Sequence, residues 1–278
     1  MGKLKKFLGA TAVVLGTAYV GISALAKAKK KLEMNDEDLH KDEYIDAGKP
    51  VEIRKKSLYE SKLKSVIDKT LSFGGLVVLS PVYAALSLAV YIDDPGPVLF
   101  TQKRVGQNKE YFKLHKFRSM KMSTPHDTPT HLLENPDQYI TRVGKFLRKF
   151  SLDELPQIWD IFIGNMSIIG PRPALWNQAD LVEERDKYGA NDVKPGLTGW
   201  AQINGRDELE IDVKSKLDGE YVDELKKGLL KGLAMDIKCF VGTILSVLKH
   251  DGVVEGGTGE IHRAEQENEQ EEKSVLTV

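Results

Sequence analysis

The longest apolar stretch of the chain covers residues 71–92, which are 22 residues without a charged side chain. Charged residues enclose it, with Asp68 and Lys69 before it and Asp93 and Asp94 after it. A helix rises about 1.5 Å per residue, so this stretch is long enough to cross the hydrocarbon core of a bilayer. The pattern therefore predicts a membrane-inserted segment.

Ser80-Pro81 interrupts this stretch near its middle. Proline lacks a backbone N–H and clashes with the preceding turn, so we expect the helix to break or bend there. Two halves of about eleven residues would each reach about 16 Å, enough to enter one leaflet and return as a re-entrant helical hairpin. A kinked helix that spans the bilayer fits the periodicity equally well, and a buried helix of a soluble fold is a third interpretation.

A second apolar stretch, residues 7–25, is 19 residues long and has lysines on both sides. The positive-inside rule therefore gives it no orientation. It predicts a possible membrane helix, with a signal peptide as the alternative, although no small-residue cleavage site follows. Residues 33–50 then hold seven acids against two lysines, which indicates a solvated acidic linker.

Shorter elements are predicted after residue 94. Residues 98–106 and 111–118 alternate apolar and basic side chains, which predicts two strands joined by a turn near Gln107-Asn108. Residues 139–159 have helical periodicity with aromatic and basic side chains, as interfacial helices do. Further helices are expected at 174–188, 212–227 and 234–249, and a surface loop at 123–137. The pattern thus predicts several helices and one pair of short strands.

Charge nearly cancels over the whole chain, with 40 Lys and Arg against 41 Asp and Glu. This balance does not favour a nucleic-acid-binding protein. Residues 102–121 nevertheless hold seven basic residues and one acid, an excess that suits lipid headgroups or substrate phosphates. The single cysteine, Cys239, excludes an internal disulfide and a Cys-based zinc site, and we expect a buried core thiol.

Two adjacent carboxylates, Asp153 and Glu154, lie in the apolar segment 151–157. Neighbouring side chains on a helix point about 100° apart, so the two acids cannot face each other as a glycosidase pair does. One of them could attack a substrate while the other holds a metal ion. The alternative is ordinary helix capping by Ser151, with the two acids in the first turn.

Four motifs follow one another in a specific order: Lys116-Phe117-Arg118-Ser119-Met120, Ser151-Leu152-Asp153-Glu154-Leu155-Pro156-Gln157, Gly170-Pro171-Arg172-Pro173, and a Pro-Gly-Leu-Thr-Gly-Trp block over residues 195–206. Together with the proline-broken apolar segment, they closely resemble the bacterial sugar transferase family, the monotopic phosphoglycosyl transferases, over roughly residues 62–249. The resemblance implies transfer of a sugar-1-phosphate from a UDP-sugar to undecaprenyl phosphate, with release of UMP. It also implies magnesium, a covalent intermediate, and the initiation of exopolysaccharide, capsule or glycoprotein glycan assembly.

Carried onto this chain, the resemblance makes Asp153 the nucleophile and Glu154 its partner, with both holding Mg²⁺. Arg148 would bind phosphate through its forked guanidinium, and Arg172 would contact the nucleotide. Further residues with expected phosphate or nucleotide roles are Pro171, Pro173, Lys116, Arg118, Thr198, Gln202 and Arg206. The residues expected to shape the membrane hairpin are Ser80, Pro81, Lys64 and Asp68.

The resemblance implies an α/β fold class, a small membrane-associated domain with a re-entrant helical hairpin broken at Ser80-Pro81, interfacial amphipathic helices and a short sheet. It also suggests a division of the chain. Residues 1–60 form an appendage, 61–93 the re-entrant helix pair, 94–250 a cytosolic catalytic domain, and 251–278 an acidic disordered tail. The protein would sit in the bacterial cell membrane with the catalytic domain on the cytoplasmic face. Its partners would be the UDP-sugar, undecaprenyl phosphate, membrane lipids and either downstream glycosyltransferases or a second copy of the chain, without nucleic acid.

Three positions depart from the family pattern. Ser65 stands where an arginine is common at the hairpin entrance, which leaves Lys64 as the substitute anchor. Asp160 stands where asparagine is common, and Asn165 where aspartate is usual, so a metal role for that loop is in doubt. Two alternatives to a transferase are a hydrolase of UDP-sugars and a catalytically silent membrane scaffold that recruits glycosyltransferases. The intact pair of acids argues against the scaffold.

Overall fold

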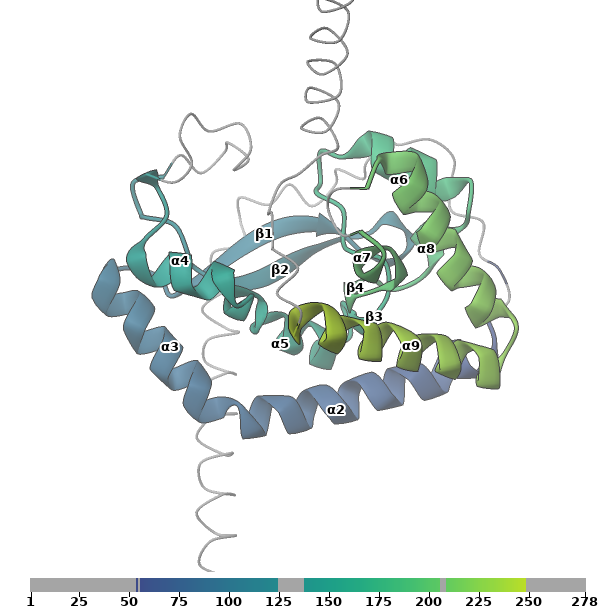
Figure 1. The fold of residues 1–278 in the computed structure, drawn as a ribbon, viewed down its shortest axis with the longest axis horizontal. Coiled ribbons are helices and arrows are strands. Elements are labelled where there is room, and N and C mark those ends of the chain that lie inside the picture. The colour runs from purple at the N-terminus through teal and green to yellow at the C-terminus, as the bar shows by residue number, and fades with distance from the viewer. Residues whose placement is uncertain (1–53, 55, 125–137, 206–208, 249–278) are drawn as a thin grey trace, which may run out of the picture.

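A computed structural model describes residues 54, 56–124, 138–205 and 209–248 (Figure 1). Several sequence-based expectations therefore lie outside the described residues. These are the membrane helix at 7–25, the acidic linker at 33–50, most of the loop at 123–137, Arg206, and the C-terminal tail at 251–278.

The apolar segment forms a bent pair of helices. The π-helical turn η2 (Tyr59–Leu63) runs into α2 (Lys64–Val78), and α3 (Ser80–Asp93) follows after a break at Leu79. The bend is 62°, and Pro81 lies in the first turn of α3, so the predicted break is confirmed. Within the described parts of the chain, only this bent pair, and no single helix, has the length and apolar composition to cross a membrane.

The two helices form a wide V (Figure 1), a geometry that either a re-entrant helix pair or a kinked spanning helix can adopt. Leu79 keeps backbone angles of the right-handed helical region, with φ −85° and ψ 0°, so the chain bends but does not reverse. Ser80 Oγ donates a hydrogen bond of 2.8 Å to the carbonyl of Val77. Val77 is the residue whose carbonyl would have received the N–H that Pro81 lacks, so the hydroxyl replaces the missing donor.

Two short sheets follow. Strands β1 (Leu99–Val105) and β2 (Tyr111–Phe117) pair antiparallel across the turn η3 (Gln107–Lys109), as predicted. Asn108 has φ 55° in this turn, a conformation that asparagine tolerates better than most residues. Strands β3 (Ser167–Ile169) and β4 (Gly196–Thr198) pair in parallel, which the sequence pattern did not predict.

The expected helix over residues 139–159 is wrong in its extent. The chain forms α4 (Arg142–Lys149), the short 3-10 helix η6 (Leu152–Glu154) and α5 (Gln157–Ile163). Ser151 separates α4 from η6 with φ 53°, a left-handed conformation that no helix continues through. The side chain of Ser151 makes no capping hydrogen bond, so the capping interpretation is also wrong.

The remaining elements build the C-terminal part of the domain. They are α6 (Ala179–Asp186), η7 (Ala190–Asp192), α7 (Trp200–Ile203), α8 (Ile211–Lys226) and α9 (Leu229–Leu248). In Figure 1, α2 runs along the lower edge of the fold, below α5 and α9, and α8 descends to the start of α9. The predicted helices at 174–188, 212–227 and 234–249 are therefore present, the first shorter than expected and the last longer.

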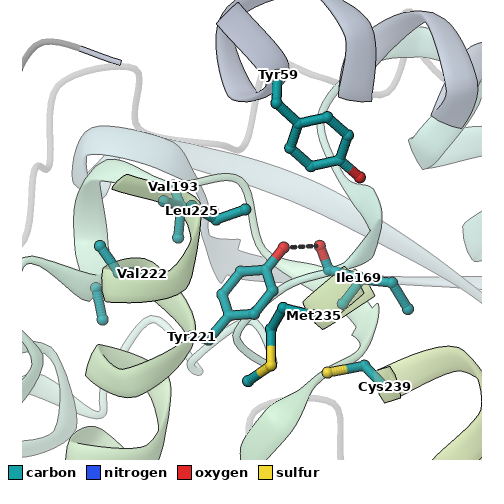
Figure 2. Close-up of a cluster of buried hydrophobic side chains, with 9 residues drawn as sticks. Tyr59, Ile169, Val193, Tyr221, Val222, Leu225, Met235 and Cys239 are labelled. Carbon is teal, nitrogen blue, oxygen red and sulfur yellow. Dashed lines mark hydrogen bonds between the residues drawn. The ribbon is translucent and has the colours of Figure 1, made fainter. Parts of the chain in front are cut away.

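The largest hydrophobic cluster joins η2, α8, α9 and β3 (Figure 2). The Tyr221 hydroxyl lies in this core, 2.8 Å from Asp236 Oδ1 and 3.1 Å from the carbonyl oxygen of Ile169. Cys239 is fully buried in the same cluster, as predicted, and burial raises the pKa of its thiol to about 12. This core packs α8 and α9 against β3, which pairs with β4 near the candidate site.

Candidate active site

The paired carboxylates lie on η6, between α4 and α5. Because Ser151 takes a left-handed conformation, the chain leaves α4 sharply and η6 packs against both β2 and α4. Asp153 is buried, with 5% of its surface exposed, while the side chain of Glu154 keeps 17%. The two neighbouring acids thus differ in burial, with Glu154 the more exposed of the two.

Glu154 is the meeting point of two cations from distant segments. Lys116 Nζ on β2 and Arg172 Nη2 in the turn after β3 each lie 3.1 Å from Glu154 Oε1. Burial alone would raise the pKa of Glu154, but the charges and hydrogen bonds of Arg172 and Lys116 outweigh it and hold this pKa well below its usual range. Glu154 is therefore ionised at neutral pH, and the structure joins three of the predicted site residues.

Arg148, on α4, contacts the Lys116–Met120 motif. Its Nε donates a 2.9 Å hydrogen bond to Ser119 Oγ, just beyond the end of β2. The close approach of α4 depends on Gly144, since a Cβ there would come within 2.0 Å of the Ser119 carbonyl oxygen. Arg148 thus lies against the Lys116–Met120 motif, and its phosphate role stays a prediction.

Arg118 has a different environment from Lys116. Its guanidinium pairs with the Asp94 carboxylate at 3.1 Å and also donates to the Asp94 backbone carbonyl. Asp94 directly follows α3, so Arg118 ties the end of the bent helix pair to the sheet. This contact favours a fastening role over the expected contact with phosphate.

The turn that carries Arg172 is held on both sides. The Pro171 carbonyl accepts a 2.8 Å hydrogen bond from the backbone N–H of Gly196, and the Pro173 carbonyl accepts one of 2.9 Å from Arg104 Nη1. Gly170 lies directly against β4, in the block of residues 195–206. A Cβ on Gly196 would come within 2.1 Å of the Gly170 nitrogen. The two glycine-containing motifs therefore interlock through their backbones.

Thr198 and Gln202 form hydrogen bonds that hold the 195–206 block in place. The Thr198 hydroxyl is 2.7 Å from that of Thr243 on α9, and Gln202 Nε2 donates to the Leu197 carbonyl at 3.1 Å. Both side chains thus fasten the block, and their expected contact with nucleotide stays a prediction. Arg206, the last residue of that motif, lies outside the described residues.

The hairpin residues Lys64 and Asp68 dock α2 onto the domain. Lys64 Nζ lies 2.5 Å from Asp236 Oδ2 on α9, and only 8% of Lys64 is exposed. Asp68 accepts hydrogen bonds from Ser167 Oγ at 2.7 Å and from the Ile168 N–H at 3.1 Å, both on β3. Lys64 is therefore buried between α2 and α9, and its role as the substitute anchor at the hairpin entrance stays a prediction.

Sequence reasoning missed a buried pair next to the site, His115 and Asp160. Asp160 Oδ1 lies 2.7 Å from His115 Nδ1, and Asp160 Oδ2 accepts the His115 backbone N–H at 2.9 Å. Asp160 is fully buried, and burial raises its pKa although His115 opposes the shift. The signal was an acid inside the apolar run of α5, since a buried carboxylate needs a partner. Asp160 thus closes the free edge of β2.

Asn165, another position that departs from the family pattern, lies next to Asp160. Its backbone N–H donates a 2.9 Å hydrogen bond to the Asp160 carbonyl. Within the described part of the chain, no group of three His, Cys, Asp or Glu side chains is placed to hold a metal. Asp153 and Glu154 still offer the carboxylate oxygens that Mg²⁺ takes when substrate phosphates and water complete its shell. Both cations bind Oε1 of Glu154, which leaves the other carboxylate oxygen for a metal, so the pair fits the ion.

The proteins to which this chain is similar include several named as undecaprenyl-phosphate sugar-phosphate transferases. The chain is 42% identical over 169 residues to the UDP-glucose:undecaprenyl-phosphate glucose-1-phosphate transferase of Escherichia coli (strain K12), a match over 58% of this chain and 36% of that protein. It is 36% identical over 176 residues to the UDP-N-acetylgalactosamine-undecaprenyl-phosphate N-acetylgalactosaminephosphotransferase of Aeromonas hydrophila, over 59% of this chain and 40% of that one. The chain thus spans well under half the length of these two relatives.

A third relative is of similar size to the matched region. The exopolysaccharide production protein PSS of Rhizobium leguminosarum bv. phaseoli is 34% identical over 193 residues, which cover 67% of this chain and 95% of that protein. The family model described as bacterial sugar transferase matches residues 59–250, the range that holds the bent helices, η6 and the interlocked motifs. The chain therefore belongs to the bacterial sugar transferase family.

Proposed function

We propose that this protein is a phosphoglycosyl transferase that moves a sugar-1-phosphate from a UDP-sugar to undecaprenyl phosphate and releases UMP. One observation carries the proposal: Lys116 and Arg172 converge on Glu154, directly beside the buried Asp153. Such a cluster can bind a diphosphate and present a carboxylate to it. The names of the E. coli and Aeromonas relatives support this reaction class.

In the first step, an Asp153 carboxylate oxygen attacks the phosphorus that bears the sugar. The bond from that phosphorus to the bridging oxygen breaks, and UMP leaves with the electron pair. An acyl phosphate remains, in which Asp153 carries the phosphosugar. Arg172 and Lys116 offset the negative charge on the diphosphate, since a carboxylate would otherwise be repelled from it.

In the second step, a phosphate oxygen of undecaprenyl phosphate attacks the same phosphorus. The bond to the Asp153 oxygen breaks, and the carboxylate is regenerated together with undecaprenyl diphosphate sugar. One difficult displacement is thereby divided into two. Arg148 lies on the neighbouring helix α4 and is the residue that we expect to orient a phosphate.

Magnesium fits this reaction class, with Asp153 and Glu154 as its protein ligands and substrate phosphates completing its shell. When bound, the ion would supply charge neutralisation for the diphosphate and for the leaving UMP. Glu154 is prepared for this role because its ionised form is stabilised by Arg172 and Lys116. The chain's own residues thus hold the charges that the ion would complement.

We further propose that the bent helices enter one leaflet and return, which leaves the catalytic domain on the cytoplasmic face of the bacterial membrane. Exposed apolar side chains support this: Val78 beside the break is 75% exposed, and Leu88 and Ile92 on α3 are 60% and 69% exposed. A bend whose carbonyl is satisfied by Ser80 can sit in hydrocarbon without bound water. A kinked spanning helix is the alternative.

The product would begin a lipid-linked glycan, as in exopolysaccharide, capsule or glycoprotein assembly. The name of the Rhizobium relative, an exopolysaccharide production protein, supports the first of these. Downstream glycosyltransferases or a second copy of the chain are the expected protein partners. The relatives' names include glucose and N-acetylgalactosamine donors, so the sugar is left to experiment.

The test is UMP release by the detergent-purified chain from a panel of UDP-sugars, with and without undecaprenyl phosphate and Mg²⁺. We expect release that requires the acceptor and the metal, and that is lost in Asp153→Asn. Equal release without acceptor would indicate a hydrolase instead. A panel without any turnover would favour the scaffold interpretation. Trapping of radiolabelled phosphosugar on the wild-type chain, but not on the variant, would establish the covalent step.

A further inference from the structure

Two lysines lie close together on the side of the fold that carries α2, and neither forms an ion pair with a described residue. Lys194, before β4, and Lys69, on α2, both approach Gly164 at the end of α5. Lys194 Nζ and Lys69 Cε lie 3.6 Å and 3.7 Å from the position that a Cβ on Gly164 would occupy. Two segments more than a hundred residues apart thus bring two lysine side chains to the same glycine.

Neither amine has a hydrogen-bond or ion-pair partner among the residues that the structure describes. Lys69 is exposed and Lys194 is half-buried. The buried lysines 64, 109 and 116, by contrast, are each paired with a carboxylate. The nearby Asp68 is occupied by Ser167 and Ile168. Burial lowers the pKa of Lys194, Asp68 opposes the shift, and the charges of nearby lysines, Lys69 first among them, lower it further.

Aromatic side chains line the surface beside this lysine pair. Phe162 on α5 stacks between Phe73 of α2, at 5.9 Å between ring centroids, and Trp159, at 5.7 Å. Phe73 is 45% exposed and Ile163 is 40% exposed, so the apolar surface is open to the outside. Aromatic rings next to lysines are typical of the boundary between lipid headgroups and acyl chains.

We propose that Lys69 and Lys194 bind the phosphate headgroup of an anionic bilayer lipid, whose acyl chains lie against Phe73, Phe162 and Ile163. This inference rests on the membrane association proposed above. The lipid would supply the missing negative charge between α2, α5 and the β4 loop. It would thereby fasten the fold onto an acidic membrane surface at a defined point.

The site is separate from the candidate active site. Asp153 and Glu154 precede the N-terminus of α5, whereas Gly164 follows its C-terminus. The seven residues of α5 put about 10 Å between its two ends at about 1.5 Å per residue. The ligand is therefore assigned to the bilayer and not to the undecaprenyl phosphate that reacts at Asp153.

The test uses the full-length chain in a neutral detergent, with the thermal midpoint followed while dioctanoyl phosphatidylglycerol is titrated. The variant is Lys69→Gln with Lys194→Gln, and the matched control is Lys226→Gln with Lys227→Gln, which removes the same charge from exposed ion pairs on α8. Each lysine near an anionic lipid surface strengthens binding about fivefold, so we expect the apparent Kd to rise about twenty-five-fold in the variant and to stay unchanged in the control. Dioctanoyl phosphatidylcholine should produce no shift in either protein.

Several results would overturn the assignment. Equal weakening in the control would make it a bulk charge effect, and equal binding of phosphatidylcholine would remove the need for an anion. Inorganic phosphate that binds as tightly would indicate a free-phosphate site, and tighter binding of undecaprenyl phosphate would make it an acceptor site. Should the double variant not fold, the exposed Lys69→Gln alone carries the test, with an expected fivefold loss. Because no turnover is measured, loss of lipid binding and failure of the transferase proposal are distinguished.

Discussion

Two carboxylates, Asp236 and Glu154, organise charge in different ways. Asp236 on α9 is a closed centre: Lys64 and Tyr59 bind Oδ2 and Tyr221 binds Oδ1, so both oxygens are used. Glu154 receives Lys116 and Arg172 on a single oxygen, and the Arg172 side chain keeps 28% of its surface exposed.

The difference separates a structural cluster from a binding cluster. A closed network holds three helices in one arrangement, because each of its buried groups is satisfied within the protein. An open network leaves hydrogen-bonding capacity for a ligand. Without the ligand, the unused groups make the free protein locally less stable. The same pairing of acid and cation can therefore serve rigidity or recognition, depending on which atoms are left over.

The largest effect should come from Asp153. Replacement by Asn removes the proposed nucleophile while the size of the side chain is kept, so we expect turnover to fall about ten-thousand-fold with little change in thermal midpoint. UMP release measures the first quantity and thermal unfolding the second. Asp223→Asn, at an exposed acid on α8, is the control and should keep full activity. A residual rate above about a tenth of wild type would exclude Asp153 as nucleophile.

The closed centre predicts the opposite outcome. Asp236→Ala leaves the buried Lys64 without its counter-charge, so we expect a loss of about 3–5 kcal/mol in the free energy of unfolding. Turnover per folded molecule should change much less than in Asp153→Asn. Denaturant unfolding in detergent gives the stability, and Asp223→Ala, whose exposed pair contributes under about 1 kcal/mol, is the comparison. Equal stability of the two variants would contradict the structural role of this centre.

Glu154→Gln tests the open centre directly. The amide keeps the shape but loses the charge that Lys116 and Arg172 neutralise, and we expect activity to fall about a hundredfold. Stability should change by less than in Asp236→Ala, because the Glu154 side chain is partly exposed. Steady-state kinetics with one UDP-sugar, beside denaturant unfolding, measures both. A loss of stability as large as that of Asp236→Ala would mean that Glu154 is structural.

The smallest effect concerns Cys239, beside the closed centre. Burial raises the pKa of its thiol to about 12, so the thiol stays neutral at pH 8, well below that value. We expect the folded chain to resist a thiol reagent such as dithionitrobenzoate at pH 8, with the reaction appearing only on unfolding. Rapid labelling of the native chain would mean that the core around α9 opens readily.

Local signals predicted much of the fold. The proline at Pro81 marked the break between α2 and α3, and the alternating pattern on either side of Asn108 marked β1 and β2. Both depend on residues close together in sequence. Strands β3 and β4 were missed because three residues are too few to establish a period, and their pairing joins distant segments.

The candidate site was predicted only residue by residue. The motifs named Lys116, Glu154 and Arg172, but nothing in their spacing implied that both cations meet one carboxylate oxygen. The turn at Ser151 was missed because serine before two acids ordinarily indicates a helix cap. The pairing of His115 with Asp160 is likewise non-local, although an acid in an apolar helix announced that some partner existed.

The contact between Gly170 and Gly196 has a consequence for mutational surveys of the family. The turn that carries Arg172 depends on the close backbone contact between Gly170 and Gly196. A methyl group on Gly196 would lie 2.1 Å from the Gly170 nitrogen. A survey that ranks residues by sensitivity should therefore find some of its most damaging single changes at positions without any reactive group. Loss of activity on substitution would there report the accuracy of assembly and not a part in the chemistry.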